Sequence, residues 1–397
     1  MSAAATWSTP LDVRRQVQRL WDDGRMLAAR VSGEALFPFE LRLRQPSVAD
    51  IGEQFDAVRS WVREWEREWE RSGACEIAWR EINHRQTGRN RLPERAIVAS
   101  ADDALRLIGR GADARRFDQL ADATLDAFPQ LREWLARRAL TVLEQAAQWP
   151  RILTILQWFV SHPRPGIYLR QLDIAGVDSK FIEGRKALLI ELLDQVLPKE
   201  AIRHDATGAR QFEARYGLLG KPALVRLRIL DPALAIGGLT DLSVPVSQFA
   251  ALAIGAGRVF ITENEINGLA FPDARDAIVV FGGGYGVERL AQVPWLRARE
   301  VVYWGDIDTH GFAILDRLRA ALPQARSLLM DSATLHAHRL LWGTEEADKR
   351  FTGELTRLGA DEHALYQALR DDVFGERLRM EQERIGFGWV REAIAGL

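Results

Sequence analysis

Two aspartates, Asp306 and Asp308, follow an apolar run at residues 301–304 that is typical of a buried strand. Residues two apart in an extended chain point to the same side, so both carboxylates are expected to project together. Carboxylates held side by side at neutral pH repel each other, and a bound cation relieves the repulsion. Mg2+ prefers oxygen ligands and needs few of them from protein. The spacing therefore predicts a divalent-metal site at the carboxyl end of a strand, where open α/β sheets place ligands.

A second apolar run, at residues 259–262, ends in a third acid, Glu263, and a third run at 278–281 leads into a glycine-rich segment at 282–286. This turn is not a dinucleotide-binding fingerprint, because Val287 stands where the third glycine of that motif is required. No Gly-Lys-Ser/Thr follows, so it is not a P-loop either. We expect these glycines to let the backbone approach a ligand or a neighbouring strand.

Three regions differ in texture along the 397 residues. Residues 7–149 are charged and predict mostly helices, with one alternating strand at 74–83. A tryptophan stripe (Trp61, Trp65, Trp69) indicates a helix packed on its own domain, or else a partner surface. The basic segment at 84–91 is either a phosphate contact or a solvated hairpin turn.

The central region predicts a helix over residues 152–159, stopped by Pro163 and Pro165, and a second helix over 179–197. This order is that of a helix-turn-helix or winged-helix module, although many small helical domains look alike. Candidate DNA-binding residues on the leading turns of its second helix are Lys180, Arg185 and Lys186.

From residue 212 onward, apolar runs at 224–230, 258–262, 277–281 and 301–304 alternate with helical patterns, which predicts an α/β domain with a largely parallel sheet. The fold class is therefore α+β and multidomain, with domains at residues 1–150, 151–207 and 208–397. The net charge of −2 excludes a generally basic nucleic-acid protein, and the single Cys75 excludes a disulfide framework. Without a signal peptide or an apolar membrane span, we expect a soluble, cytoplasmic protein.

The order strand–Glu, strand–Gly, strand–Asp-x-Asp resembles the Toprim fold of topoisomerases, primases and several nucleases. Residues 305–311 look especially similar to the version in archaeal topoisomerase VI A subunits, where a CAP-like winged-helix domain precedes the Toprim domain. Five segments together resemble the JetD family, the nuclease subunits of bacterial Wadjet anti-plasmid systems: Tyr168-Leu169-Arg170-Gln171-Leu172, Gly176-Val177-Asp178-Ser179-Lys180-Phe181-Ile182-Glu183, Thr262-Glu263-Asn264, Phe281-Gly282-Gly283-Gly284-Tyr285-Gly286 and Glu381-Gln382-Glu383-Arg384-Ile385.

The resemblance implies a Mg2+- or Mn2+-dependent endonuclease that cleaves closed circular plasmid DNA with an SMC-like ATPase complex, including its kleisin and accessory subunits. Glu263, Asp306 and Asp308 then match the Toprim acids and are the expected catalytic and metal-binding residues. Glu263 either binds the metal or acts as general base, while Glu265 and Glu383 are candidates for a second ion or plain surface carboxylates. Phosphate contacts are expected from Arg289 and Arg297, and His310 either contacts phosphate or has a structural role.

Two alternatives stay open. A topoisomerase VI A-like subunit requires a nucleophilic tyrosine, and Tyr168 is the only tyrosine at residues 151–200. We interpret it as a packing residue, which favours hydrolysis by water. The other alternative is a non-catalytic DNA-binding partner of an SMC complex. Because one site cuts one strand, we expect a homodimer that binds duplex DNA between the helix-turn-helix and Toprim domains, with no membrane contact.

Overall fold

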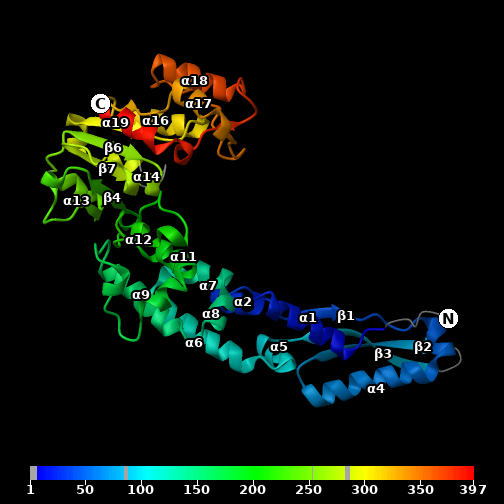
Figure 1. Ribbon diagram of the computed structural model, residues 1–397. Coiled ribbons are helices and arrows are strands. Elements are labelled where there is room, and N and C mark those ends of the chain that lie inside the picture. Colours follow the sequence, from blue (N-terminus) through cyan, green and yellow to red (C-terminus); the bar gives the residue numbers. More distant parts are fainter. Residues whose placement is uncertain (1–6, 85–87, 253, 282–286) are drawn as a thin grey trace. The chain divides into compact units, whose positions relative to one another are not determined.

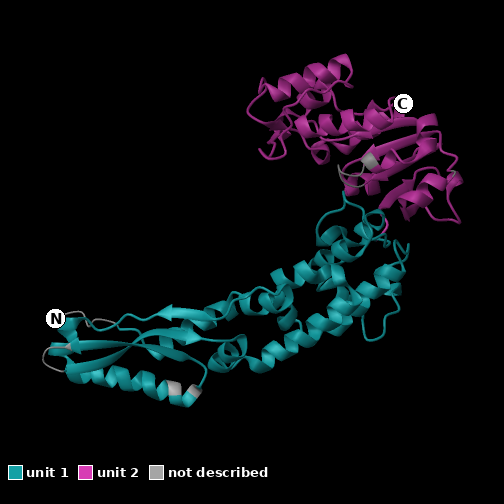
Figure 2. Ribbon diagram, turned by 180° about the vertical axis from the view of Figure 1, so that it is seen from behind, with its two compact units in different colours: residues 1–220 teal, residues 221–397 magenta. Residues whose placement is uncertain are grey.

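The computed structural model describes residues 7–84, 88–252, 254–281 and 287–397. The chain is a mixed α/β protein in two compact units, which divide between Gly220 and Lys221 (Figure 2). Each unit has its own hydrophobic core. Within the described ranges, no helix combines the length and apolar character that crossing a membrane requires.

The N-terminal part of unit 1 combines helices with a small antiparallel sheet of order β1-β3-β2 (Figure 1). The predicted strand at 74–83 is confirmed as β2, although the sheet makes this region less helical than expected. Helix α4 packs on β2 and β3, and its Trp61 and Trp65 are only 5% and 1% exposed, which confirms core packing for both. The side chain of Trp69 and residues 85–87 of the basic segment lie outside the described residues. The elements are α1 (Pro10–Asp22), α2 (Arg25–Ser32), β1 (Phe39–Arg42), α3 (Val48–Glu53), α4 (Phe55–Ser72), β2 (Glu76–His84) and β3 (Gly88–Val98).

The remainder of unit 1 is helical. As predicted, α9 ends at Ser161, just before Pro163. The expected boundary near residue 150 lies within the first turn of α9, and the one near residue 207 precedes a short 3-10 turn. The elements are α5 (Ala101–Ile108), α6 (Gly111–Ala127), η1 (Pro129–Leu131), α7 (Arg132–Arg137), α8 (Ala139–Glu144), α9 (Trp149–Ser161), η2 (Leu169–Gln171), α10 (Ser179–Glu183), α11 (Lys186–Val196), η3 (Lys199–Ala201), η4 (Ala209–Gln211) and α12 (Phe212–Arg215).

The single helix expected over residues 179–197 is wrong, because the chain forms α10 and α11 with a break at Gly184 and Arg185. Asp178 caps α10, since its side chain accepts a hydrogen bond from the Phe181 N–H at 2.8 Å. Arg185 leaves helical geometry with φ −128° and ψ 12°, and its guanidinium lies 4.1 Å from the centre of the Phe181 ring. This cation–π contact folds the side chain back over α10.

Unit 2 is built on a six-stranded sheet of order β5-β4-β7-β6-β8-β9. All four predicted strands are confirmed, as β4, β6, β7 and β8. Strands β7, β6, β8 and β9 run parallel, and β4 is antiparallel to both of its neighbours, β5 and β7, so only β4 is reversed and the prediction of a largely parallel sheet is confirmed. Nearly every residue of β6, β7 and β8 is buried, which explains their continuous apolar runs. The strands are β4 (Leu224–Ile229), β5 (Asp241–Pro245), β6 (Arg258–Thr262), β7 (Ala277–Phe281), β8 (Glu300–Trp304) and β9 (Arg326–Ser327).

A second, two-stranded ribbon of β10 (Gly343–Thr344) and β11 (Leu378–Arg379) brings the C-terminal segment back to the main sheet. Ile307 and Met380 exchange backbone hydrogen bonds of 2.9 and 3.0 Å, so residues 379–383 lie beside the end of β8. The other elements of unit 2 are η5 (Pro232–Leu234), α13 (Val246–Ala251), α14 (Glu265–Ala270), α15 (Val287–Leu290), η6 (Pro294–Ala298), α16 (Thr309–Ala321), α17 (Ser332–Ala337), η7 (Arg339–Leu341), α18 (Ala360–Arg370), η8 (Gln382–Arg384) and α19 (Phe387–Ala395).

Candidate functional site

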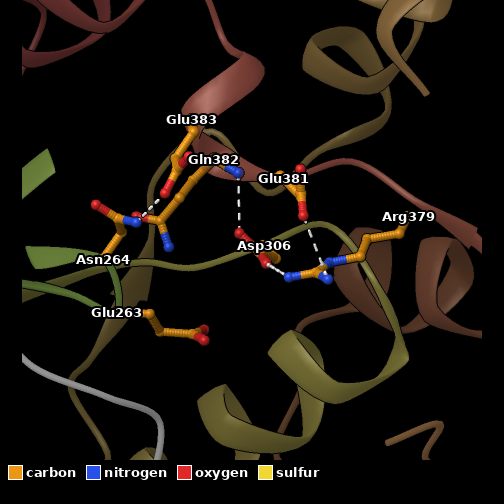
Figure 3. Close-up of a pocket in the computed structure, with 7 residues that line it drawn as sticks. All are labelled: Glu263, Asn264, Asp306, Arg379, Glu381, Gln382 and Glu383. Atoms are coloured by element: carbon orange, nitrogen blue, oxygen red, sulfur yellow. Dashed lines mark hydrogen bonds and ion pairs between the residues drawn. The ribbon is translucent and has the colours of Figure 1, made fainter. Parts of the chain in front are cut away.

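The carboxyl ends of β6 and β8 place two of the expected acids at one edge of the sheet. These strands are parallel neighbours, with Thr262 opposite Trp304, so Glu263 and Asp306 leave the sheet on the same side. Both line a cavity of about 220 Å³ (Figure 3). The remaining lining residues are Asn264, Arg379, Glu381, Gln382 and Glu383.

Asp306 is held by the C-terminal segment. Its Oδ1 accepts a hydrogen bond from the Gln382 backbone N–H at 2.9 Å, and its Oδ2 accepts one from Nη2 of Arg379 at 2.6 Å (Figure 3). Asp306 as a whole is only 9% exposed, so its charged contact with Arg379 takes place largely away from bulk water. An arginine–carboxylate contact of this length is a strong, charge-assisted hydrogen bond.

Asp308 begins α16 as its N-cap. Its Oδ1 accepts the Gly311 N–H at 2.7 Å, and its Oδ2 lies 3.1 Å from Nε of Arg379. A side chain at Gly311 would overlap the carbonyl oxygen of Asp306, so glycine permits the first turn of α16 to pack against this acidic segment. Arg379 thus connects the two aspartates of the Asp-x-Asp motif.

Glu263 is partly buried at the end of β6. The Tyr303 hydroxyl donates a hydrogen bond to its Oε1, and any side chain at Gly305 would overlap the same oxygen. Burial raises the pKa of Glu263 to about 7, and the charge of Asp306 adds to the shift, while the Tyr303 hydrogen bond and Arg379 oppose it. Glu263 therefore exchanges its proton near neutral pH.

Asp308 is perturbed in the same direction. Burial raises the pKa of its carboxyl to about 8, with further contributions from the charges of Glu345 and Asp306. The hydrogen bond from Gly311 and the charge of Arg379 act against this rise. Strong shifts of this kind, at a cavity and with specific charged neighbours, are typical of functional sites.

Two residues of this site, Arg379 and Glu345, escaped the sequence interpretation. Arg379 contacts Asp306 and Asp308 and also lies 3.3 Å from Glu381. Glu345 is 2% exposed and accepts hydrogen bonds at the start of α16. No local pattern marks them, because they reach the acids through the β10–β11 ribbon, 36 to 73 residues away in the chain.

The remaining candidates in unit 2 differ in their surroundings. Glu265 forms an ion pair with Arg226 at the start of α14, and Glu383 accepts a hydrogen bond from the Asn264 side chain. His310 is half-buried, and burial together with the charge of Arg317 lowers its pKa. Both arginines expected to contact phosphate, Arg289 and Arg297, are exposed on α15 and η6, whereas the glycine-rich residues 282–286 lie outside the described residues.

The unit 1 candidates differ in availability. Lys180 is exposed in the first turn of α10, but Nζ of Lys186 is largely buried in a 2.7 Å ion pair with Glu213. The interpretation of Tyr168 as a packing residue is wrong, because it is 45% exposed. It precedes the 3-10 turn η2, and its backbone N–H donates to the Gln171 side chain at 2.8 Å.

The acidic centre fits a divalent cation in the chemistry of its donors. Asp306 and Asp308 each direct one oxygen at the same positively charged guanidinium, so a cation position already exists between them. Nε of Arg379 is buried and has no hydrogen-bond partner in the described part of the chain, so Arg379 fills this position incompletely. No group of three His, Cys, Asp or Glu side chains in the described ranges converges on one point, but Mg2+ commonly uses one or two carboxylates with water and substrate phosphates.

Fold and site together define a class: a mixed α/β protein whose carboxylates gather at the ends of adjacent parallel strands. Residues 217–394 match the family described as "Wadjet protein JetD, C-terminal". Residues 10–194 match the family described as "Uncharacterized protein conserved in bacteria N-term (DUF3322)". The C-terminal region of the chain, residues 217–394, belongs to the JetD family, as its motifs indicated. Comparison with curated proteins gave no match.

Proposed function

We propose that this protein is the nuclease subunit of a Wadjet defence system and cleaves closed circular DNA by divalent-metal-dependent hydrolysis. The observation that carries the proposal is the position of Glu263, Asp306 and Asp308 just after the carboxyl ends of the neighbouring parallel strands β6 and β8, with Arg379 bridging the two aspartates. Membership of the JetD family supports a role as a Wadjet subunit. We assign unit 2 to the Toprim class and the α9–α11 region of unit 1 to a winged-helix module, on the motif order given above.

Asp306 and Asp308 would hold the ion, each through the oxygen that now faces Arg379. When bound, Mg2+ or Mn2+ neutralises charge on the phosphoryl group and the leaving oxygen. Glu263 would accept the proton of the attacking water, because a pKa of about 7 lets it act as a base at neutral pH. Tyr303 orients it by occupying Oε1, which leaves Oε2 for the cavity that Glu263 lines.

Double-stranded plasmid DNA is the proposed substrate, and an SMC-like ATPase complex with its kleisin and accessory subunits is the proposed partner. The decisive experiment incubates the purified protein, alone and with this complex, with supercoiled plasmid in Mg2+, Mn2+ or EDTA. We expect cleavage only with a divalent ion, and its loss in Asp306→Asn, Asp308→Asn and Glu263→Gln. A matched control is Glu265→Gln, since Glu265 forms an ion pair with Arg226 rather than joining the acid cluster. Cleavage that persists in EDTA or in Asp306→Asn would falsify the proposal.

One observation favours a second candidate. The exposed ring of Tyr168 leaves a topoisomerase-like tyrosyl attack sterically open. Hydrolysis predicts that Tyr168→Phe cleaves as well as the natural protein and that no protein stays attached to the DNA ends. A covalent adduct that resists boiling in detergent, together with an inactive Tyr168→Phe, would instead establish the tyrosyl mechanism.

A further inference from the structure

We propose that Arg379 is an exchangeable internal counter-ion: it holds the acid cluster together without metal and gives up its place when a divalent cation binds. This inference rests on the proposed metal-dependent function but concerns a different step. It assigns a role to a residue that lies outside the expected acid motif.

The position of the guanidinium supports this role. Its nitrogens lie 2.6 Å from Oδ2 of Asp306, 3.1 Å from Oδ2 of Asp308 and 3.3 Å from Oε1 of Glu381. Glu263 lies on the same cavity and is also influenced by the charge of Arg379. Glu381 also pairs with Arg384 at 2.8 Å, so Asp306 and Asp308 share the positive charge of Arg379, which leaves this pair of carboxylates short of positive charge. A divalent ion supplies more charge in a smaller volume.

The contacts of Arg379 are unequal. Only the contact with Asp306 is a short hydrogen bond, since Nε has no hydrogen-bond partner in the described residues although Asp308 is nearby. A guanidinium satisfied in this partial way loses little when it leaves Asp308, because that contact is electrostatic and poorly aligned. The 2.6 Å hydrogen bond to Asp306 is the main interaction that a metal ion must replace.

The surroundings allow the side chain to move while its backbone stays fixed. The backbone of Arg379 pairs with that of Gly343 in the β10–β11 ribbon. The backbone of the following residue, Met380, is hydrogen-bonded to that of Ile307. The guanidinium itself borders the cavity of about 220 Å³ (Figure 3). Rotation into this cavity frees one oxygen of each aspartate without disturbing Gln382, whose N–H keeps Asp306 oriented.

Competition with Arg379 should weaken metal binding in the natural protein, because the ion must first displace the guanidinium. The apparent affinity for the metal equals the intrinsic affinity multiplied by the fraction of molecules in which Arg379 has left the position. Arg379→Gln removes the competitor and keeps much of the side-chain length. We expect it to bind Mn2+ at least fivefold more tightly in isothermal titration calorimetry at pH 7.5.

The same variant should be less thermostable than the natural protein in EDTA, and Mn2+ should raise its melting temperature by more. Arg357→Gln is the matched control, because Arg357 pairs with the buried carboxylate of Asp316 at 2.9 Å, away from the cavity. It should also lower the melting temperature but leave Mn2+ affinity unchanged. If Arg379→Gln does not fold, Arg379→Lys is the substitute, because it keeps the positive charge but lacks the planar guanidinium that contacts two carboxylates. It should bind Mn2+ more tightly than the natural protein, but by less than the fivefold expected for Arg379→Gln.

Three outcomes separate this inference from the nuclease proposal. Mn2+ affinity that is unchanged or weaker in both Arg379 variants overturns the counter-ion role, even where the natural protein cleaves DNA. Absence of Mn2+ binding to every variant overturns it as well. Tighter Mn2+ binding by Arg379→Gln, without metal-dependent cleavage by the natural protein or its complex, supports the counter-ion role and overturns the nuclease activity.

Discussion

The hydroxyl oxygen of Thr309 lies 2.8 Å from both carboxylate oxygens of Glu345, which joins the first residue of α16 to the end of the β10 strand. The His310 N–H donates to the same carboxylate at 3.1 Å. A buried negative charge is therefore fixed at the N-terminus of α16, where the helix dipole and free N–H groups stabilise it. Glu345 supports the helix that presents Asp308.

Replacement of Glu345 should destabilise unit 2. Glu345→Ala leaves the buried Thr309 hydroxyl and the His310 N–H without their acceptor, which typically costs about 1–3 kcal/mol. In urea-induced unfolding, we expect Glu345→Ala to have a lower midpoint concentration, with the same dependence of the unfolding free energy on urea concentration as the natural protein. The neighbouring Glu346→Ala is the control, because Glu346 is exposed and forms a surface ion pair with Lys349, so the midpoint of this variant should match that of the natural protein. Equal midpoints for the two variants would contradict the structural role of Glu345.

Stability without metal should fall as pH rises from about 4 to about 8. The folded state raises the pKa of Asp308 to about 8 and of Glu263 to about 7, so it binds more protons than the unfolded chain in this window. The stabilisation from these two protonated carboxyls is fully present below the ordinary carboxyl pKa. It is lost once the pH rises above the pKa values of the folded state. One pKa unit corresponds to about 1.4 kcal/mol.

Thermal melts in EDTA at pH 5 and pH 8 measure this dependence. Asp308→Asn should reduce this dependence, because the amide does not ionise and only the contribution of Glu263 remains, while Asp205→Asn, at an exposed ion pair in unit 1, should leave the dependence unchanged. A melting temperature that rises between pH 5 and pH 8 in the natural protein would refute the expected sign.

The acids of the site were accessible from the sequence because their signals are local. A buried strand followed by Glu263, and another followed by Asp306 and Asp308, needs only an apolar run and an acid at its end. The expectation that these acids act together came from the resemblance of the motif order to a known fold. The structure shows that β6 and β8 are directly hydrogen-bonded neighbours in the sheet.

Long-range features were not accessible. Arg379 and Glu345 belong to the site only because Met380 pairs with Ile307 and β10 pairs with β11, and neither two-residue strand has a periodic pattern. The break between α10 and α11 was missed because the Arg185–Phe181 contact overrides a continuous helical pattern. Burial of the Tyr168 ring was predicted from the general tendency of tyrosine to pack its ring. In the structure, Tyr168 precedes the 3-10 turn η2 and its ring is exposed.

DNA binding should depend on salt and little on sequence, because phosphate contacts dominate such interfaces. Lys180 is exposed, so Lys180→Gln should weaken binding uniformly and reduce the slope of log affinity against log salt by about 1. Lys186→Gln is the informative contrast, since Lys186 is paired with Glu213 and should affect stability while leaving the salt slope unchanged. Fluorescence anisotropy on duplexes of unrelated sequence measures both quantities. A strong consensus at mapped cut sites, or a slope reduced only by Lys186→Gln, would refute this assignment.

Assembly follows from the number of strands to be cut. In the proposed function, one set of Glu263, Asp306 and Asp308 would cleave one phosphodiester, whereas linearising a plasmid requires a break in each antiparallel strand. Two centres related by a two-fold axis meet this requirement, and two-fold dimers are the commonest oligomers. We therefore expect light scattering to give twice the 44.8 kDa chain mass, off DNA or on it. Mixing natural protein with excess Asp306→Asn should convert double-strand breaks into nicks, because mixed dimers carry one working site. A strictly monomeric mass on DNA, with double-strand cleavage unaffected by the inactive variant, would show that a single site acts twice.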